Sequence, residues 1–269
     1  MTGMTPEDHR AAGEALFKAE MNGHQIPLLS QQFAQMDLDD AYAVQDHVVA
    51  AREAAGYKRV GWKIGLTSRA MQEALQITTP DSGVLFEDML FANGSTIPRG
   101  RFIQPRVEAE IGFILKADLE GADITRDAVL AATDYVTPAL ELLDTRIQRM
   151  DPVTRAIRKV TDTISDNAAN GGLVLGEGRF DPATTDLRWM GCILQRDGVV
   201  EETGLGAGVL NDPVEGIVWL VRRLAQYGQS LSAGDIVLAG SFIRPVEAPS
   251  GSVFFADYGP YGSVSCDFA

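Results

Sequence analysis

The chain has 269 residues, 45% of them hydrophobic, which is enough to bury a substantial core in one large domain or two small ones. Its net charge of −14 at pH 7 argues against nucleic-acid binding, because a polyanion would meet a repulsive surface. No stretch approaches the ~20 apolar residues of a membrane span, and the first ten residues are polar, so we expect a cytoplasmic protein. The two cysteines, Cys192 and Cys266, are expected to be buried free thiols.

The first part of the chain has the pattern of helices and the rest has the pattern of a sheet. Two early segments are rich in Ala, Glu and Gln and carry apolar residues at helical spacing, at residues 6–21 and 38–55. From residue 59 onward, short β-branched and aromatic runs are punctuated by glycine. We therefore predict one α+β catalytic domain over residues 1–269, with a helical N-terminal layer (1–58) and a β-rich core (59–269) that carries the functional site.

The second half of the chain contains clear turn and cap signals. Asp197-Gly198 predicts a tight hairpin turn. Residues 213–227 predict a helix that begins with a proline and stops at a glycine. After it, residues 236–239 predict a strand, and residues 253–268 predict a hairpin.

Residues 103–115 alternate, since every odd-numbered residue is apolar. Such period-two alternation predicts a β-strand with one face in the core. The other face presents Arg106, Glu108 and Glu110, with the two carboxylates roughly 6–7 Å apart at their bases. The simpler interpretation of this pair is a solvated outer face. The alternative is a divalent cation between the carboxylates, because a cation turns their repulsion into binding.

Glu141 favours the cation. It has leucine on both sides and follows Pro138 and Ala139, a context that a solvated surface explains poorly. A carboxylate in an apolar run is costly unless a positive group satisfies it. Three carboxylates without a nearby histidine or cysteine suit a hard ion, Mg²⁺ or Mn²⁺, with water or substrate oxygens completing its shell. We therefore predict a metal site formed by Glu108, Glu110 and Glu141.

Lys63 and Asp81 are candidates for proton transfer. Lys63 lies in an apolar, strand-like run, where partial desolvation would favour its neutral amine. Glycines at positions 61 and 65 would let other groups approach the backbone closely. The simpler interpretation is a lysine whose stem packs on the core while its ammonium reaches solvent or a carboxylate. Asp81 lies in a turn-like segment, and a turn-capping role explains it at least as well as catalysis.

A basic segment stands out in this acidic chain, formed by Arg146, Arg149, Arg155, Arg158 and Lys159. Guanidinium groups bind carboxylates in a forked geometry, so the segment is suited to hold the far end of a dicarboxylate whose near end lies on the metal. Pairing with the acidic residues of a neighbouring subunit is an equal alternative.

The three histidines, His9, His24 and His47, all precede the predicted sheet. Imidazole chemistry at the carboxylates therefore requires the N-terminal layer to fold over them. Serine hydrolase chemistry and a histidine-bound zinc are correspondingly disfavoured.

Taken together, these motifs resemble a known family. Over most of its length the chain is similar to the 2-keto-4-pentenoate hydratase and 2-oxo-3-hexenedioate decarboxylase group of the fumarylacetoacetate hydrolase superfamily. The similarity rests on residues 61–68, 105–110, 138–142, 164–169 and 233–238. The resemblance implies a mixed β-roll with surrounding helices, assembled as a homo-oligomer, with pentamers and decamers as the candidate sizes. It also implies that Glu108, Glu110 and Glu141 hold Mg²⁺ or a similar ion.

The resemblance implies further roles. Lys63 and Asp81 match acid/base candidates beside the substrate, and Ser165 matches a residue near it. Within the group, the basic segment and residues 240–246 and 257–259 are most similar to members that hydrate 2-oxo-hept-4-ene-1,7-dioate to 4-hydroxy-2-oxoheptanedioate in the meta-cleavage catabolism of homoprotocatechuate. We therefore expect a 2-oxo dicarboxylate substrate and assign Arg106, Arg146 and Arg158 to substrate binding.

The implied mechanism has the substrate's C1 carboxylate and C2 oxygen chelate the metal, which makes C4 electrophilic, while Lys63 and Asp81 move the protons. Three other functions stay open. Decarboxylation of 2-oxo-3-hexenedioate would use the same electron sink. Acylpyruvate hydrolysis typically employs a histidine near the metal, and a metal-binding protein without catalysis would share the fold and the carboxylates.

Overall fold

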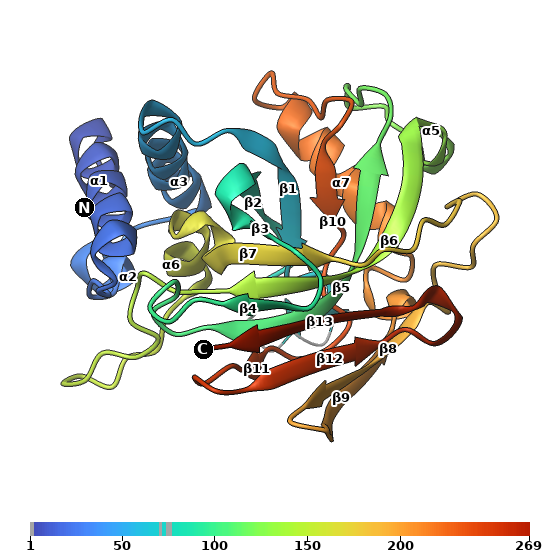
Figure 1. The fold of residues 1–269 in the computed structure, drawn as a ribbon. Coiled ribbons are helices and arrows are strands. Elements are labelled where there is room, and N and C mark those ends of the chain that lie inside the picture. Colours follow the sequence, from blue (N-terminus) through green and yellow to red (C-terminus); the bar gives the residue numbers. More distant parts are fainter. Residues whose placement is uncertain (1–2, 70–71, 74–76) are drawn as a thin grey trace.

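A computed structural model describes residues 3–69, 72–73 and 77–269. Two long helices, α1 (Pro6–Asn22) and α3 (Leu38–Ala54), pack together at one side of the molecule (Figure 1), where the sequence predicts them. Each begins with a capping box: the side chain of Thr5 or Asp37 accepts a hydrogen bond from the backbone N–H of Asp8 or Asp40, whose side chain accepts one from the backbone N–H of the capping residue. The short helix α2 (Leu29–Gln32) connects them in sequence, and α6 (Val160–Ser165) packs on α3.

The larger of two sheets has eight strands, which are β1 (Arg59–Gly65), β2 (Asp81–Phe86), β3 (Leu90–Phe91), β5 (Arg106–Leu115), β6 (Thr133–Leu143), β7 (Asn170–Leu175), β10 (Ile236–Leu238) and β11 (Val246–Glu247). Their order is β2-β1-β10-β5-β6-β7-β3, and β11 also pairs with β5. The sheet is mixed, because β1–β10 and β3–β7 are parallel whereas β5–β6 is antiparallel.

The second sheet has five strands in the order β4-β13-β12-β8-β9. Their bounds are β4 (Ser95–Ile97), β8 (Gly191–Arg196), β9 (Val199–Leu205), β12 (Val253–Asp257) and β13 (Ser263–Phe268). Both predicted hairpins are present: Asp197 and Gly198 make the turn between β8 and β9, and β12 pairs with β13. This sheet packs on the larger one through contacts of β13 with β6 and β7.

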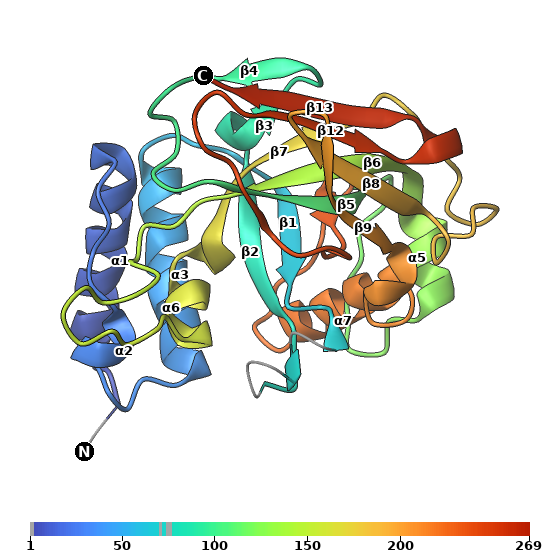
Figure 2. The ribbon, with the colours of Figure 1, turned by 90° about the horizontal axis from the view of Figure 1, so that it is seen from below.

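Two further helices, α5 (Arg126–Ala132) and α7 (Pro213–Ala225), pack on each other at the side remote from α1 and α3 (Figure 2). Helix α7 begins at Pro213 as predicted, and the side chain of Asp212 accepts a hydrogen bond from the backbone of Val214. The predicted α+β class, with a mixed, curled sheet and a helical N-terminal layer, is confirmed. That residues 1–269 form one catalytic domain stays a prediction.

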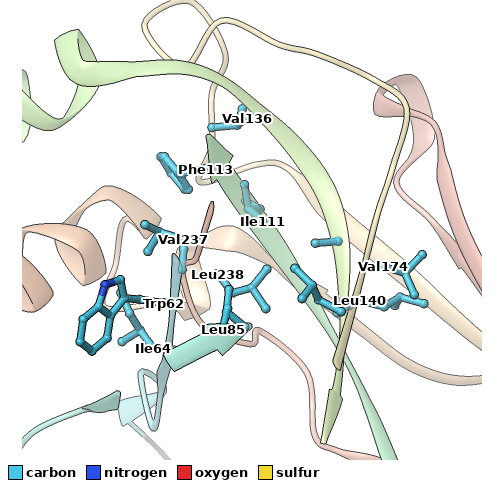
Figure 3. Packing of buried hydrophobic residues seen from close by; sticks show 14 of the residues in the cluster. Trp62, Ile64, Leu85, Ile111, Phe113, Val136, Leu140, Val174, Val237 and Leu238 are labelled. Atoms are coloured by element: carbon cyan, nitrogen blue, oxygen red, sulfur yellow. The ribbon is translucent and has the colours of Figure 1, made fainter. Parts of the chain in front are cut away.

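The core lies on the larger sheet (Figure 3). The odd-numbered residues 107–115 of β5 are all at most 2% exposed, which confirms the predicted alternation. The opposite face is not a solvated surface, because Glu110 is also fully buried, so that interpretation is wrong for this residue. Cys192 and Cys266 are buried free thiols. Within the described ranges, no helix is both long and apolar enough to cross a bilayer.

A buried arginine fastens the helical layer to the sheet. Arg52 on α3 is 1% exposed and forms ion pairs with Glu20 on α1 and with Asp88 after β2, the second at 2.6 Å. Its guanidinium carbon also lies 4.4 Å and 4.5 Å from the ring centroids of Tyr57 and Phe86. These contacts join three segments, so a buried charge network rather than apolar packing alone sets the position of α3.

We expect Arg52→Ala to lower the free energy of unfolding by about 3–5 kcal/mol, because it leaves Glu20 partly buried without its cation and Asp88 with Arg101 as its remaining partner. Urea denaturation followed by circular dichroism measures the change. Arg10→Ala is the matched control, since Arg10 is 51% exposed in its pairs with Glu7 and Glu14 and its loss should change stability by less than about 1 kcal/mol. Equal losses in both variants would contradict the assignment.

Candidate metal centre and active-site pocket

Three carboxylates converge between β5 and β6, two of them fully buried and that of Glu108 partly exposed. Glu108 lies directly opposite Glu141 in the antiparallel register, and Glu110 projects from the same face of β5 two residues further on. One oxygen of each residue lies within 4.8 Å of the other two. Glu110 and Glu141 are 0% exposed. The structure thus brings together the three residues that the sequence predicts as a metal site.

The oxygens of this cluster lack the partners that burial requires. Glu110 Oε2 accepts a hydrogen bond from the backbone N–H of Gly240 at 2.8 Å. Among the described residues, Glu110 Oε1 and both carboxylate oxygens of Glu141 accept none. A buried carboxylate without donors is costly, and a set of anionic oxygens suits a hard divalent cation. The residues present therefore fit Mg²⁺ or a similar ion.

The same shortage of positive charge raises the pKa values of Glu108 and Glu110. Burial, reinforced by the charge of Glu141, raises the pKa of Glu108 to about 8. Burial and the charges of Glu141 and Glu108 hold the pKa of Glu110 well above its usual range. Without a cation, these carboxyl groups therefore favour bound protons, which a metal ion would displace.

Lys63 is the nearest cation to the three glutamates. It lies on β1, is 3% exposed, and its Nζ is 3.2 Å from Oε1 of Glu141. Burial alone lowers the pKa of Lys63, but the charges of Glu141 and Asp81, with those of the other two glutamates, outweigh it and raise the pKa. The surrounding carboxylates therefore favour the ammonium, and the contact with Glu141 agrees with the simpler interpretation, in which the ammonium reaches a carboxylate.

Asp81 reaches the same site because of a glycine. In the antiparallel pair β1–β2, Asp81 lies opposite Gly65. A Cβ at position 65 would stand 2.2 Å from Oδ1 of Asp81 and 3.2 Å from Nζ of Lys63, so only glycine leaves room for both groups. Asp81 is buried, and burial raises its pKa although Lys63 opposes this. The close approach predicted at Gly65 is confirmed.

A pocket of about 400 Å³ lies next to these charged residues. Its lining includes Lys63, Asp81 and Glu108, together with the arginines Arg106, Arg149 and Arg158. Apolar side chains complete the wall, among them Leu66, Leu143, Ile157 and Ile243. Among the described residues, none before Lys63 lines it, so the three histidines lie outside the pocket walls. A second cavity of about 420 Å³ near the C-terminus contains none of the predicted metal-binding or catalytic residues.

Arg146 does not line this pocket, which corrects its assignment to substrate binding. Its Nε lies 2.5 Å from Oδ1 of Asp166, and its Nη groups donate to the backbone carbonyls of Asp166 and Asn170 at 2.7 Å and 2.8 Å. All of these partners belong to the protein. The guanidinium of Arg146 is thus a structural clamp around the segment between Asp166 and Asn170.

The clamped segment is a left-handed turn that sequence reasoning missed. Asn167, Ala168 and Ala169 have φ angles of 49°, 52° and 57°, a region that costs roughly 1–2 kcal/mol per residue for side chains with a Cβ. Ala168 and Ala169 line the pocket. Ser165 just before the turn does not, because it is fully buried with Oγ 3.5 Å from the carbonyl of Ala41. Its predicted contact with substrate is therefore not supported by its position.

Two more hydroxyl groups lie at the site, although the sequence analysis assigned them no part in catalysis or binding. The hydroxyl of Tyr258 lies 2.8 Å from the carbonyl oxygens of both Glu110 and Ala139, bridging β5 and β6 beside the cluster. Thr67 lines the pocket and is 2% exposed, and its Oγ1 has no hydrogen-bond partner within the described part of the chain. A hydroxyl next to a glycine-rich strand was the only sequence signal for Thr67.

Comparisons with known proteins identify the family of the chain. No family model matches the sequence. The chain is 49% identical over 260 residues to 2-oxo-hept-4-ene-1,7-dioate hydratase of Escherichia coli, covering 97% of each protein, and 40% identical to 2-keto-4-pentenoate hydratase of Paraburkholderia xenovorans over 98% of this chain and 96% of that protein. Among solved structures, 4-oxalocrotonate decarboxylase from Pseudomonas putida G7, complexed with magnesium and adipate, superposes with a TM-score of 0.92 at 32% identity over 100% of both chains.

A more distant structure shares the fold alone. Fumarylpyruvate hydrolase from Pseudomonas aeruginosa, in complex with Mn²⁺ and pyruvate, matches with a TM-score of 0.61 at 15% identity, covering 79% of this chain and 89% of that chain. The near-complete coverage by relatives above 30% identity is decisive for the family. The chain belongs to the 2-keto-4-pentenoate hydratase and 2-oxo-3-hexenedioate decarboxylase group of the fumarylacetoacetate hydrolase superfamily.

Proposed function

We propose that this protein is a Mg²⁺-dependent hydratase that converts 2-oxo-hept-4-ene-1,7-dioate, or its dienol form, into 4-hydroxy-2-oxoheptanedioate. The observation that carries the proposal is the buried cluster of Glu108, Glu110 and Glu141 with the ammonium of Lys63 3.2 Å from Glu141 at a pocket wall. The similarity to a hydratase of this substrate supports the choice of reaction. We include in the proposal a cytoplasmic location and assembly as a homo-oligomer.

The three glutamates would hold the ion next to the pocket, which Glu108 lines. A bound dication supplies positive charge for the 1-carboxylate and 2-oxo group of a 2-oxo acid and so favours electron density there in the transition state. Lys63 is placed to hold and move protons, because its Nζ is buried beside these groups and is protonated in the field of the carboxylates. Asp81, whose pKa is raised by burial, is the second proton carrier.

The proton transfers balance with one water consumed. In the dienol, the 2-hydroxyl loses its proton and C5 gains one, which gives a 2-oxo-3-ene. Water then adds its oxygen to C4 and a proton reaches C3, which gives the 4-hydroxy-2-oxo product. Lys63 Nζ and the Asp81 carboxyl group provide and recover these protons, and the Gly65 backbone leaves the space in which both meet.

Decarboxylation is the one rival that a specific observation favours, namely the similarity to 4-oxalocrotonate decarboxylase over the whole chain. The same site would stabilise the negative charge left when CO₂ departs. Acylpyruvate hydrolysis is less well supported because no histidine lines the pocket. A metal-binding protein without catalysis would not need a buried lysine within reach of the cluster.

Product analysis separates the two reactions. We expect the protein with Mg²⁺ and 2-hydroxyhepta-2,4-dienedioate to form a seven-carbon product that is heavier than the substrate by one water, detected by mass spectrometry. Metal-free protein, prepared with a chelator, should form none. Release of CO₂ without a hydrated product would instead favour the decarboxylase.

We expect Glu108→Gln to weaken Mg²⁺ binding by more than about tenfold, because it removes the charge of one of three anionic ligands. Loss of a residue that only hydrogen-bonds to a metal ligand already weakens metal binding by about tenfold or more. Isothermal titration calorimetry measures the dissociation constant. Glu120→Gln, which removes an exposed carboxylate outside the cluster, is the control and should bind Mg²⁺ as the unsubstituted protein does. Unchanged affinity in Glu108→Gln would remove this residue from the metal site.

Lys63→Met keeps the apolar stem and removes the ammonium. We expect turnover to fall by about 10²–10⁴-fold, as for loss of a positioned acid or base, while Mg²⁺ binding and folding survive. Steady-state kinetics and calorimetry on the same preparation give both values. The control Lys116→Met removes an exposed lysine and should retain activity. Substantial turnover by Lys63→Met would assign the proton transfers to another group.

A further inference from the structure

Three arginines line the pocket, and two of them share one carboxylate of the protein. Arg106 Nε donates to Glu247 Oε1 at 2.7 Å, and Arg149 Nη1 donates to the same oxygen at 2.9 Å. Arg149 also donates to the backbone carbonyl of Gln104 at 2.8 Å. The strand pair β5–β11 holds this arrangement, because Glu247 lies opposite Arg106 in its register. Both guanidinium groups therefore have a counter-ion within the protein.

Arg158 has none. Among residues 3–69, 72–73 and 77–269, no carboxylate oxygen lies within 4.0 Å of its guanidinium, which donates instead to the neutral hydroxyl of Thr145. The charges of Asp166 and Asp162 act on Arg158 from further away, but Asp166 is already paired with Arg146, and Asp162 accepts hydrogen bonds from Ser30 and Lys159. Burial lowers the pKa of Arg158 despite Asp166, and the nearby charges of Arg149 and Arg146 lower it further. A largely buried cation in this position lacks an anion.

Thr145 fixes the direction of this guanidinium. Its hydroxyl lies 2.5 Å from the carbonyl of Ile147 and so donates its hydrogen there, which leaves its lone pairs for Arg158. The backbone N–H of Arg158 is also held, by the carbonyl of Arg149 at 3.0 Å. The Arg158 head group is therefore pre-organised at the pocket wall, and a planar guanidinium with free donors binds a carboxylate in a forked geometry.

The remaining wall suits a hydrocarbon chain between two anionic groups. Leu66, Leu143, Ile157 and Ile243 also line the pocket and suit the hydrocarbon chain of a substrate. The other buried cation there, Lys63, is paired with Glu141. One anionic group would meet the ion held by the glutamates, and a second would meet Arg158, which has no carboxylate partner within 4.0 Å in the described part of the chain.

We propose that Arg158 binds the distal carboxylate of the substrate and so determines the preference of this pocket for 2-oxo dicarboxylates over 2-oxo monocarboxylates. This inference rests on the proposed function, because it takes the 2-oxo acid end to lie at the metal. Arg106 and Arg149 share the single negative charge of Glu247, and Arg146 is held by Asp166 and Asn170. Arg158, by contrast, has no carboxylate oxygen within 4.0 Å among the described residues.

Binding of two unreactive ligands of equal length tests the inference without turnover. The probes are 2-oxoheptanedioate and 2-oxoheptanoate, which differ only in a terminal carboxylate or methyl group, titrated by calorimetry in Mg²⁺. We expect the unsubstituted protein to bind the dicarboxylate about ten- to a hundredfold more tightly, as for hydrogen bonds to a charged group. In Arg158→Gln the ratio of the two dissociation constants, monocarboxylate over dicarboxylate, should fall to about one, while the affinity for 2-oxoheptanoate stays unchanged.

Two further variants sharpen the test. Arg158→Lys keeps the charge and loses the fork, so its ratio should lie between the two values, and it replaces Arg158→Gln if that variant does not fold. Arg155→Gln removes an exposed arginine of the same segment outside the pocket lining and should keep the full ratio. Retention of the ratio in both Arg158 variants, equal loss for both ligands, or no preference in the unsubstituted protein would overturn the assignment. Loss of the ratio in a protein that hydrates nothing would leave Arg158 assigned and remove only the hydratase.

Discussion

The repulsion among three clustered carboxylates is the constraint on which the site depends. Glu108, Glu110 and Glu141 are brought together by strand register. Within the described part of the chain, one backbone N–H, from Gly240, and one ammonium, from Lys63, offset their charge. A cluster so short of donors is unfavourable by itself and would become favourable with a dication. The carboxylate cluster is thus built into the pairing of β5 with β6, rather than added by a flexible loop.

Much of this could be predicted from local sequence pattern. Alternation over residues 103–115 predicts the strand and the face of Glu108 and Glu110, and the apolar surroundings of Glu141 mark it as unusual, because both signals depend only on neighbouring residues. The register that sets Glu108 opposite Glu141 depends on contacts distant in sequence. For the same reason the sequence leaves the charge state of Lys63 open: burial alone favours the amine, and the carboxylates that reverse this come from other strands.

Arg146 and Arg158 show where sequence reasoning ends. Both lie in one basic segment, and nothing in their immediate neighbours separates a structural arginine from a ligand-binding one. The distinction comes from partners 20 to 24 residues away, since Asp166 and Asn170 consume the donors of Arg146. Residue composition predicts that such a segment binds anions, whereas only the fold decides which guanidinium has its donors free.

The left-handed turn of residues 167–169 also has a bearing on how the chain folds. Its backbone is disfavoured in isolation, and it is held by distant groups: Asn167 exchanges hydrogen bonds with Val84, and the carbonyl of Ala169 accepts one from Asp144. Local preferences cannot nucleate such a shape, so this part of the pocket wall should be acquired late, after the strands have associated. A partly folded chain would therefore contain the three glutamates without the complete substrate pocket. Substrate could then bind only after the sheet has assembled.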